Sequence, residues 1–314
     1  MSTPVVLQVI SPGMLATVQD LGRPGCQSQG VPASGAMDPF SLQAGNIVLG
    51  NPRGAAGLEI ALQGPALRVL GDIAVCVSGA DLGASADGAA LARGRPVVLK
   101  PGQVISFSGQ RAGVWAYLCV EGGLDVPLVL GSRSTYMRAR LGGVEGRSLR
   151  AGDSLRALKP EGAPRRANVP ALELSGRVTV RAVPGPQEGM FLPESIEIFF
   201  SAEFRVTAQC DRMGYRLQGP VLKLVDQADI PSDGTALGSV QVPGGGHPIV
   251  LMTDRQTTGG YAKIATVISA DAPRLAQLPA GGIVTFSRVS VEEAQDAAVE
   301  QAQVLRSLEK GTGT

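Results

Sequence analysis

The stretch GSVQVPGGGHPIVLMTDRQTTGGY, residues 238–261, decides the fold class of this chain. It alternates short apolar runs with turns rich in glycine and proline, and the run Ile249–Met252 has the length and β-branched content of a strand. The polar sequence Asp254–Tyr261 follows this strand closely and contains two glycines. Glycine permits sharp turns and a close approach of the backbone to a ligand. The pattern predicts either a polar binding edge or a solvated hairpin corner.

The rest of the chain repeats this pattern of short strands. Hydrophobic residues make up 44% and aromatic residues 4% of the 314 residues, so the core must consist mainly of aliphatic side chains. The 42 glycines and 22 prolines are typical of many strands joined by turns. We therefore predict a mainly β fold of barrels or sandwiches. The other expected strands are 5–10, 66–70, 73–77, 97–99, 104–107, 114–120, 178–183 and 283–286.

Few segments carry helix signals. The segment Asp38–Pro52 predicts one helix, with Pro39 at its first position and the Gly-Asn-Pro sequence at its end. The segment Ser290–Gly311 predicts a C-terminal helix, because Glu293 stands where it completes a capping box. A short helical turn is expected after Asp271.

Two segments of similar sequence, 62–70 and 217–225, indicate an internal duplication. LQGPALRVL and LQGPVLKLV share five identical positions. A coincidence between two strand-leading Gly-Pro turns is the alternative. The polar, turn-rich segment 159–166 lies between the copies and is the expected linker. We therefore predict an N-terminal β-barrel subdomain over residues 1–165 and a C-terminal one, with the C-terminal helix, over 166–314.

Composition and motif content argue against several function classes. The formal net charge is +1, from 28 basic and 27 acidic residues, which gives no basic excess for nucleic acid. The four cysteines have no C-x-x-C spacing and His247 is the one histidine, so a metal site is poorly supported. The chain has neither a G-x-x-x-x-G-K-[ST] phosphate loop nor a G-x-S-x-G nucleophile elbow. We see no signal peptide and no apolar run of membrane-spanning length, and we expect a cytoplasmic protein.

The stretch 238–261 and its neighbours supply the candidate catalytic residues Gln241, Asp254, Arg255 and Lys263. Asp254 and Arg255 are adjacent, so in a strand one faces a ligand while the other braces the fold. Gln241 carries an acceptor and two donors on one amide and can pair with a cyclic amide or ureido edge. Lys263 either neutralises developing negative charge or is a solvated strand lysine. Nearby candidates for substrate contacts are Ser232 and Asp233, also typical of a turn, and Thr257, Thr258 and Tyr261.

A second polar group is expected in the N-terminal half. Gln19, Asp20 and Arg23 lie in a turn bounded by glycine and proline. Arg133 and Ser134 belong to a turn that suits either anion binding or the fastening of one barrel to the other. All five residues are candidate substrate contacts.

Specific motifs run in order along nearly the whole chain. They begin with QDLGRPG at 19–25 and GVPASGAMD at 30–38, continue with GSRSTY at 131–136 and DRMGYRL at 211–217, and end within 238–261. Together they resemble the KipA family, also called allophanate hydrolase subunit 2 or the carboxyltransferase subdomain A/B family. The resemblance implies two tandem cyclophilin-like β-barrel subdomains with few helices.

Within that family, stand-alone chains of this length resemble one component of a 5-oxoprolinase. The resemblance implies an enzyme that opens the lactam of 5-oxoproline to L-glutamate, with a KipI-like partner, a LamB/YcsF-like partner, and ATP bound by the assembled complex. The alternatives are a biotin-dependent carboxyltransferase or allophanate hydrolase-type component for urea-like amides, and a non-enzymatic regulatory module. Biotin-dependent relatives carry Asn at the position of Gln241, and this chain lacks the Met-Lys-Met biotin attachment sequence. Both differences favour the 5-oxoprolinase type.

Overall fold

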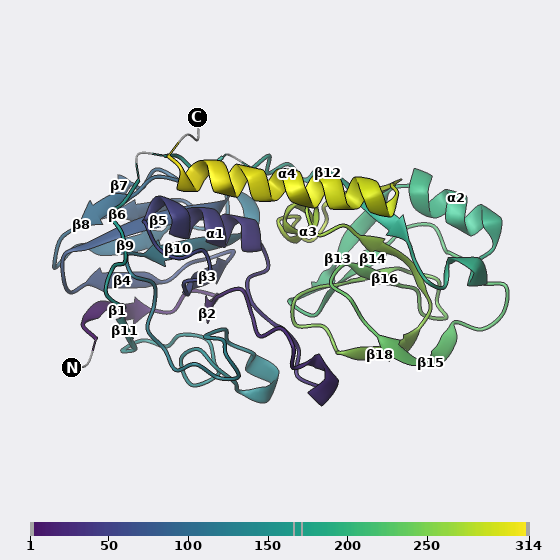
Figure 1. Ribbon diagram of the computed structural model, residues 1–314, viewed down its shortest axis with the longest axis horizontal. Helices are drawn as coiled ribbons and strands as arrows, with labels where there is room; N and C mark the ends of the chain where they lie inside the picture. Colours follow the sequence, from purple (N-terminus) through teal and green to yellow (C-terminus); the bar gives the residue numbers. More distant parts are fainter. Residues whose placement is uncertain (1–2, 166, 171, 312–314) are drawn as a thin grey trace. The chain divides into compact units, whose positions relative to one another are not determined.

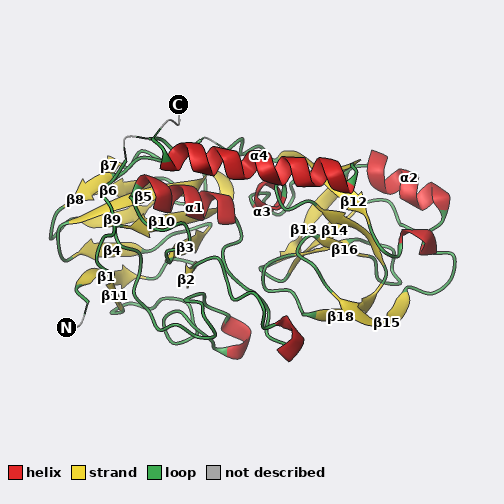
Figure 2. Ribbon diagram, in the orientation of Figure 1, coloured by secondary structure: helices red, strands yellow, loops and turns green. Residues whose placement is uncertain are grey.

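The computed structural model describes residues 3–165, 167–170 and 172–311 and confirms the mainly β prediction (Figures 1 and 2). The chain divides into two compact units, each built from more than one segment of sequence, whereas the bounds predicted above are continuous. Residue 166, at the predicted boundary, lies outside the described residues. Unit 1 comprises Met1–Arg23, Ser34–Leu174 and Ala302–Thr314, and unit 2 comprises Pro24–Ala33 and Ser175–Gln301.

Unit 1 is built on a six-stranded and a five-stranded sheet. In sheet order, the six-stranded sheet contains β11 (Ser154–Arg156), β1 (Val5–Ser11), β4 (Ala66–Val69), β9 (Val104–Phe107), β6 (Ala84–Ala86) and β7 (Ala89–Ala90). The five-stranded sheet contains β2 (Leu15–Gln19), β3 (Gly57–Ala61), β10 (Ala112–Val120), β5 (Ile73–Asp81) and β8 (Val97–Leu99). Every strand predicted for this half of the chain is present.

The core of unit 1 consists of aliphatic side chains from both sheets. Leu67 and Ile105 come from the six-stranded sheet, and Leu58, Val75 and Leu118 come from the five-stranded sheet. All are at most 1% exposed. Because side chains alternate between the faces of a strand, one face of each sheet supplies this core. The low aromatic content of the sequence is thus matched by a core of Val, Leu and Ile.

Helix α1 (Pro39–Val48) packs on β5 and β10 of the five-stranded sheet. Asp38 caps its N-terminus, because the Asp38 side chain accepts a hydrogen bond from the Ser41 amide, as the sequence predicted. At the other end, Arg165 donates to the carbonyl of Ile47 and its backbone amide donates to the carbonyl of Val48. The expected linker is therefore partly held against the C-terminus of α1, where a cation is favourable.

Unit 2 contains a closed seven-stranded barrel. Around the barrel the strands are β12 (Arg177–Pro184), β19 (Lys263–Val267), β16 (Ser239–Gln241), β17 (Ile249–Leu251), β14 (Gly214–Gln218), β13 (Phe204–Cys210) and β20 (Ile283–Arg288). A separate two-stranded ribbon pairs β15 (Asp229–Gly234) with β18 (Thr258–Tyr261). Ser232 and Asp233, also typical of a turn in the sequence, lie instead in the extended strand β15, which pairs with β18.

Short helices accompany the barrel of unit 2. The predicted turn after Asp271 is confirmed as α3 (Ala272–Ala276). Helix α2 (Pro193–Ser201) is absent from the sequence prediction, because its N-cap residue Leu192 offers no side-chain cap. The ring of Phe199 on α2 stacks on Phe286 of β20, with 4.4 Å between the ring centroids. Three-residue 3-10 segments are η1 (Gln27–Gln29) and η3 (Glu188–Met190) in this unit and η2 (Met137–Ala139) in unit 1.

The C-terminal helix α4 (Val291–Glu309) begins with the predicted capping box. The Ser290 amide donates to the Glu293 carboxylate at 2.7 Å, and the Glu293 amide donates to the Ser290 hydroxyl at 3.1 Å. After the helix, Gly311 has a φ of 71°, the left-handed conformation that the predicted glycine cap requires.

The two repeat copies agree in part. In each copy the glycine before the proline packs against an aromatic ring, because an added Cβ would lie 2.5 Å from Phe107 at Gly64 and 2.6 Å from Phe204 at Gly219. The first copy continues into β4, whereas after Gly219 the second forms only an isolated bridge at Leu224. The common glycine reflects a close backbone approach at both positions.

Candidate functional site

Gln241 and Lys263 lie opposite each other on adjacent strands of the unit 2 barrel. The two residues are partners across β16 and β19, next to a register shift after Val240, and both side chains reach the β15–β18 ribbon, since Lys263 binds Asp233 and Gln241 Nε2 borders Gly259. Only 2% of Gln241 and 3% of Lys263 is exposed. This burial does not fit the solvated strand lysine that the sequence allowed. An amide and an ammonium group are instead enclosed side by side.

Only one of the two polar atoms of the Gln241 amide has a hydrogen-bond partner among the described residues. Its Oε1 accepts a hydrogen bond from Gln256 Nε2 at 3.3 Å, and its Nε2 has no hydrogen-bond partner among the described residues. A rotation of both amides exchanges donor and acceptor and still leaves one polar atom of Gln241 unpaired. Leaving a buried polar group unpaired costs about 1–3 kcal/mol. A buried amide with an unused polar atom is therefore a candidate ligand contact.

The Lys263 ammonium is paired with Asp233 of the ribbon. Its Nζ lies 3.1 Å from Asp233 Oδ2, and the Lys263 side chain is 3% exposed whereas that of Asp233 is 56% exposed. The hydrogen bond from Lys263 lowers the pKa of the Asp233 carboxyl, with a smaller contribution from the Gly234 amide. Lys263 is therefore a buried cation whose counter-charge is screened by solvent. Such a cation can still polarise an oxygen placed beside it.

The ribbon reaches the Gln241 side chain through Gly259. Gly259 pairs with Asp233 across the ribbon, and a Cβ added at Gly259 would lie 2.6 Å from Gln241 Nε2. An added Cβ would force the end of the Gln241 side chain to move, and glycine at this position avoids that contact. We refer to Gln241, Gln256, Lys263, Asp233 and Gly259 as the amide cluster.

The other ribbon candidates lie beside the amide cluster. Ser232, Thr258 and Tyr261 are on β15 and β18, and all three side chains are exposed. Thr257 is half-buried, and its carbonyl accepts a hydrogen bond from the Thr235 amide at 3.1 Å. These residues form the outer surface of the ribbon, and Thr257 joins it to the segment that carries Thr235.

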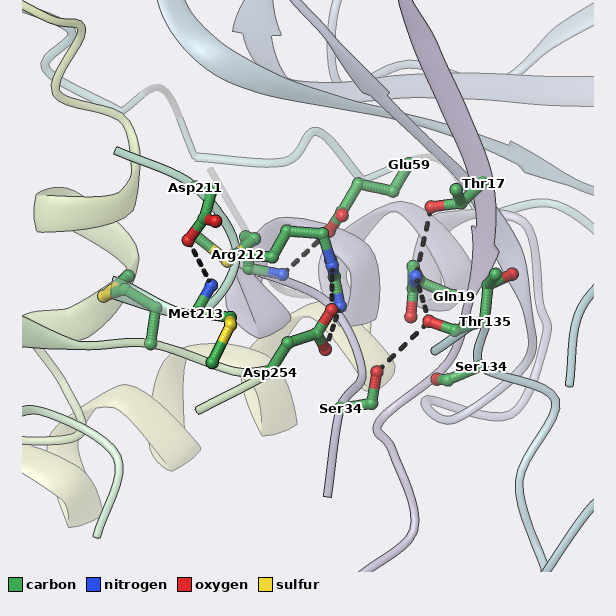
Figure 3. A network of polar contacts seen from close by, with 12 residues as sticks. Thr17, Gln19, Ser34, Glu59, Ser134, Thr135, Asp211, Arg212, Met213 and Asp254 are labelled. Carbon is green, nitrogen blue, oxygen red and sulfur yellow. Dashed lines mark hydrogen bonds and ion pairs between the residues drawn. The ribbon is translucent and has the colours of Figure 1, made fainter. Parts of the chain in front are cut away.

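Asp254 is held in a buried ion pair with Arg212. Both guanidinium contacts measure 2.9 Å, in a bidentate arrangement that Figure 3 shows from close by. The side chains are 7% and 5% exposed, respectively. Strand β17 ends at Leu251, so Asp254 lies in the following turn and not in a strand as expected. Of the two roles that the sequence allowed, facing a ligand or bracing the fold, this geometry favours bracing for Asp254.

Arg255 is hydrogen-bonded to backbone carbonyl oxygens. Its Nε donates to the Thr235 carbonyl at 3.1 Å and its Nη1 to the Met252 carbonyl at 3.3 Å. In the part of the chain that the structure describes, no carboxylate pairs with Arg255. Burial lowers the pKa of its guanidinium, with no compensating charge. Arg255 is therefore a half-buried cation that is bound only by neutral carbonyl oxygens.

Asp20 organises a second polar group, in unit 1. Its Oδ1 accepts from the Ser132 hydroxyl at 2.6 Å and from the Ser134 hydroxyl, and its Oδ2 accepts from the Arg133 amide at 2.6 Å. The Asp20 amide in turn donates to Ser134 Oγ at 3.0 Å. Every oxygen of this carboxylate is thus bound by the turn at 132–134. Asp20 fastens two loops within unit 1.

Gln19 and Arg23 complete this group. Gln19 Nε2 donates to Thr17 Oγ1 at 3.0 Å and to the Thr135 carbonyl at 3.1 Å (Figure 3). Arg23 is 1% exposed and donates to the Ser134 carbonyl. Arg133 points elsewhere, with its Nη2 at 3.5 Å from Asp125 Oδ1. The N-terminal candidates therefore do lie together, and most of their hydrogen bonds hold the loops of unit 1 in place.

Several residues of these groups were not singled out in the sequence. Gln256 and Thr235 border Gly259 in unit 2, and Ser132 and Thr135 bind Asp20 and Gln19 in unit 1. Gln256 stands inside the polar sequence Asp254–Tyr261, so its position gave a signal. Thr235 gave none, because its importance comes from the fold of the ribbon.

The described residues contain neither a metal-binding group nor a membrane-spanning helix. Across residues 3–165, 167–170 and 172–311, no group of three His, Cys, Asp or Glu side chains is placed to hold a metal ion. None of the helices in these segments combines the length and the apolar character that a bilayer crossing requires.

Similar proteins place the chain in a family. Residues 29–288 match the model for the carboxyltransferase domain, subdomain A and B. The chain is 39% identical over 306 residues to the C subunit of the 5-oxoprolinase of Escherichia coli, in a match that covers 96% of this chain and 97% of that protein. It is 39% identical over 279 residues to the corresponding C subunit of Haemophilus influenzae, with coverage of 89% and 90%.

A solved structure shares the whole fold. The crystal structure of the K. lactis urea amidolyase matches with a TM-score of 0.93 at 30% identity, and the match covers 100% of this chain and 20% of that one. Since both the family model and the relatives span most of the sequence, the chain belongs to the family of the carboxyltransferase domain, subdomain A and B.

Proposed function

We propose that this chain is one subunit of an ATP-dependent 5-oxoprolinase. In the assembled enzyme, it opens the lactam of 5-oxoproline to L-glutamate together with a KipI-like and a LamB/YcsF-like partner. The full-length similarity to two proteins that are named as the C subunit of 5-oxoprolinase supports this assignment. The word subunit in both names supports a multi-subunit enzyme.

The observation that carries the proposal is the unused polar atom of the buried Gln241 amide. A lactam presents a carbonyl acceptor and an N–H donor on one edge, and a primary amide presents the complementary pair. Gln241 Nε2, which has no partner among the described residues, would donate to the lactam oxygen, and Gln241 Oε1, which accepts from Gln256, would accept from the lactam N–H through its second lone pair. Lys263, the partner of Gln241 across β16 and β19, would stabilise negative charge on the lactam oxygen.

The chemistry requires help beyond this cluster. Opening the ring breaks the bond between the lactam carbonyl carbon and nitrogen; water adds its oxygen to the carbon and a proton goes to the nitrogen. An amide is stabilised by resonance, so ATP bound by the assembled enzyme would transfer its terminal phosphoryl group to the lactam oxygen and release ADP. Attack by water would then be easier, and a second water would release inorganic phosphate. The chain has no glycine-rich phosphate loop, so we assign the nucleotide to the assembled enzyme. The role of this chain is to bind and orient the lactam and to polarise its oxygen.

A urea-like amide is the second candidate substrate. The urea amidolyase of Lachancea kluyveri is 30% identical over 98% of this chain, which covers 18% of that protein. Urea and its carboxylated form also present amide edges that suit Gln241. The test must therefore include both types of amide.

The decisive experiment is co-expression of this chain with a KipI-like chain and a LamB/YcsF-like chain. The purified assembly is assayed for glutamate release and ADP formation with 5-oxoproline, and for turnover of allophanate and of urea with bicarbonate. We expect glutamate release that depends on all three chains. Turnover of the urea-like amides without glutamate release would overturn the proposal in favour of the second candidate.

A further inference from the structure

Arg255 is a cation without a counter-charge beside the amide cluster. Its guanidinium is half-buried, and the Thr235 and Met252 carbonyls are its hydrogen-bond partners in the described chain. A buried charge is unfavourable unless it is paired. The other buried cations of unit 2, Arg212 and Lys263, both have carboxylate partners. An external anion would therefore supply the counter-charge that Arg255 lacks among the described residues.

Thr235 connects Arg255 to the amide cluster. The Thr235 carbonyl accepts from Arg255 Nε at 3.1 Å, and its hydroxyl donates to the Gln256 carbonyl. A Cβ built on Gly259 would lie 3.2 Å from Thr235 Cγ2 and 2.6 Å from Gln241 Nε2, so both side chains border the same point. One residue therefore separates the guanidinium from the unused Gln241 amide.

We propose that Arg255 binds the carboxylate of the substrate, so that the site selects amides that carry an anion. This inference rests on the proposed function. It adds a contact to the substrate carboxylate, which the amide cluster alone does not bind. A guanidinium offers a planar fork of donors that matches a carboxylate in two hydrogen bonds. 5-Oxoproline and allophanate both combine an amide edge with a carboxylate. 2-Pyrrolidinone and urea have the amide edge alone.

The test compares acid and neutral ligands in the assembled enzyme. The variants are Arg255→Gln, Arg255→Lys and the control Arg216→Gln, which removes an exposed arginine on β14 of the same barrel. The measurements are KM for 5-oxoproline and the inhibition constant of 5-oxoprolinamide, which replaces the carboxylate by a neutral amide. Thermal melts of each variant accompany the kinetics.

We expect Arg255→Gln to raise KM for 5-oxoproline about 10- to 100-fold, the effect of losing a charge-assisted hydrogen bond. The inhibition constant of 5-oxoprolinamide should stay unchanged, since the neutral ligand makes no ion pair. Arg255→Lys should fall between wild type and Arg255→Gln, and Arg216→Gln should match wild type. A purely structural Arg255 would change both ligands equally, and that result, or an unchanged KM, would overturn the inference.

Two further outcomes are distinguishable. If Arg255→Gln does not fold, Arg255→Lys decides: equal weakening of acid and amide counts against carboxylate binding. If the wild-type assembly releases no glutamate from 5-oxoproline, the proposed function fails, and calorimetry with allophanate then tests Arg255 alone. Binding of allophanate that Arg255→Gln abolishes and Arg255→Lys weakens supports an anion site with another substrate, whereas equal binding by all three proteins, or no binding to wild type, overturns it.

Discussion

At the residue scale, a substitution of Gln241 should reduce activity much more than it reduces stability. Gln241→Met keeps the volume of the side chain and removes both amide atoms, so we expect a stability change below about 1.5 kcal/mol. Losing a contact that stabilises charge in the transition state costs about 2–4 kcal/mol, or roughly 10²–10³ in rate. Turnover of the assembled enzyme and urea unfolding of the chain measure the two effects. Normal turnover in Gln241→Met would place the site elsewhere and make the turn at 133–136 the next candidate.

Also at the residue scale, Asp254 and Arg212 should behave as a structural pair. Both side chains are buried and bound in a bidentate ion pair. Removing one partner of a buried pair leaves the other charge uncompensated and typically costs about 3–5 kcal/mol. We expect Asp254→Ala to lower the free energy of unfolding by this amount, measured by chemical denaturation. A variant of normal stability that has lost turnover would return Asp254 to the catalytic group.

At the element scale, the turn before β11 should give unit 1 an acid-sensitive contact. Asp153 accepts from Arg147 at 2.7 and 3.0 Å and from the Arg150 amide at 2.7 Å, and the Arg147 guanidinium lowers the pKa of the Asp153 carboxyl. A carboxyl with a lowered folded pKa stabilises the protein above its unfolded pKa of about 3.9, and this contribution is lost as the pH falls through the folded value.

Asp153→Asn should therefore cost about 1–3 kcal/mol at pH 7, and the difference from wild type should shrink below about pH 4. The matched control is Asp72→Asn, since Asp72 pairs with Lys100 at 2.7 Å but both side chains are more than half exposed. Exposed pairs contribute about 0–1 kcal/mol. Thermal melts from pH 3 to 7 compare the two variants. An equal and pH-independent effect of both would contradict the expectation.

At the scale of the whole molecule, the chain alone should have no 5-oxoprolinase activity. It carries the proposed amide contact Gln241 but no recognisable nucleotide-binding sequence. We expect no glutamate or ADP above background from the purified chain, measured with 5-oxoproline and ATP. Release at the rate of the assembled enzyme would show that the other subunits are dispensable.

Also at this scale, the chain should form a complex with the KipI-like partner. Size-exclusion chromatography of the mixed proteins should give a common peak that neither protein gives alone. Gln241→Met should join the same peak, because its substitution is inside unit 2 and buried. Separate elution at micromolar concentration would count against the complex.

The sequence by itself determined the local structure. Strands such as β9 and β8 have the predicted bounds, and the ends of α1 and α4 carry the predicted caps. These features depend on side-chain periodicity, on capping hydrogen bonds between residues three positions apart, and on the conformational range of glycine and proline. Such interactions are short-range, so the order of residues is sufficient to predict them.

Only the tertiary structure decided what each polar residue does. Asp254 and Arg255 are neighbours in sequence, yet one is neutralised by Arg212 and the other has no carboxylate partner in the described chain. Lys263 is buried and pairs with Asp233 of the ribbon, and Gly259 of the ribbon lies against Gln241; a sequence pattern does not specify these contacts between distant segments. Burial and pairing depend on contacts between distant segments, and these set the energy of a charge or amide. The burial and the charge pairing of the candidate site residues are therefore set by the tertiary structure.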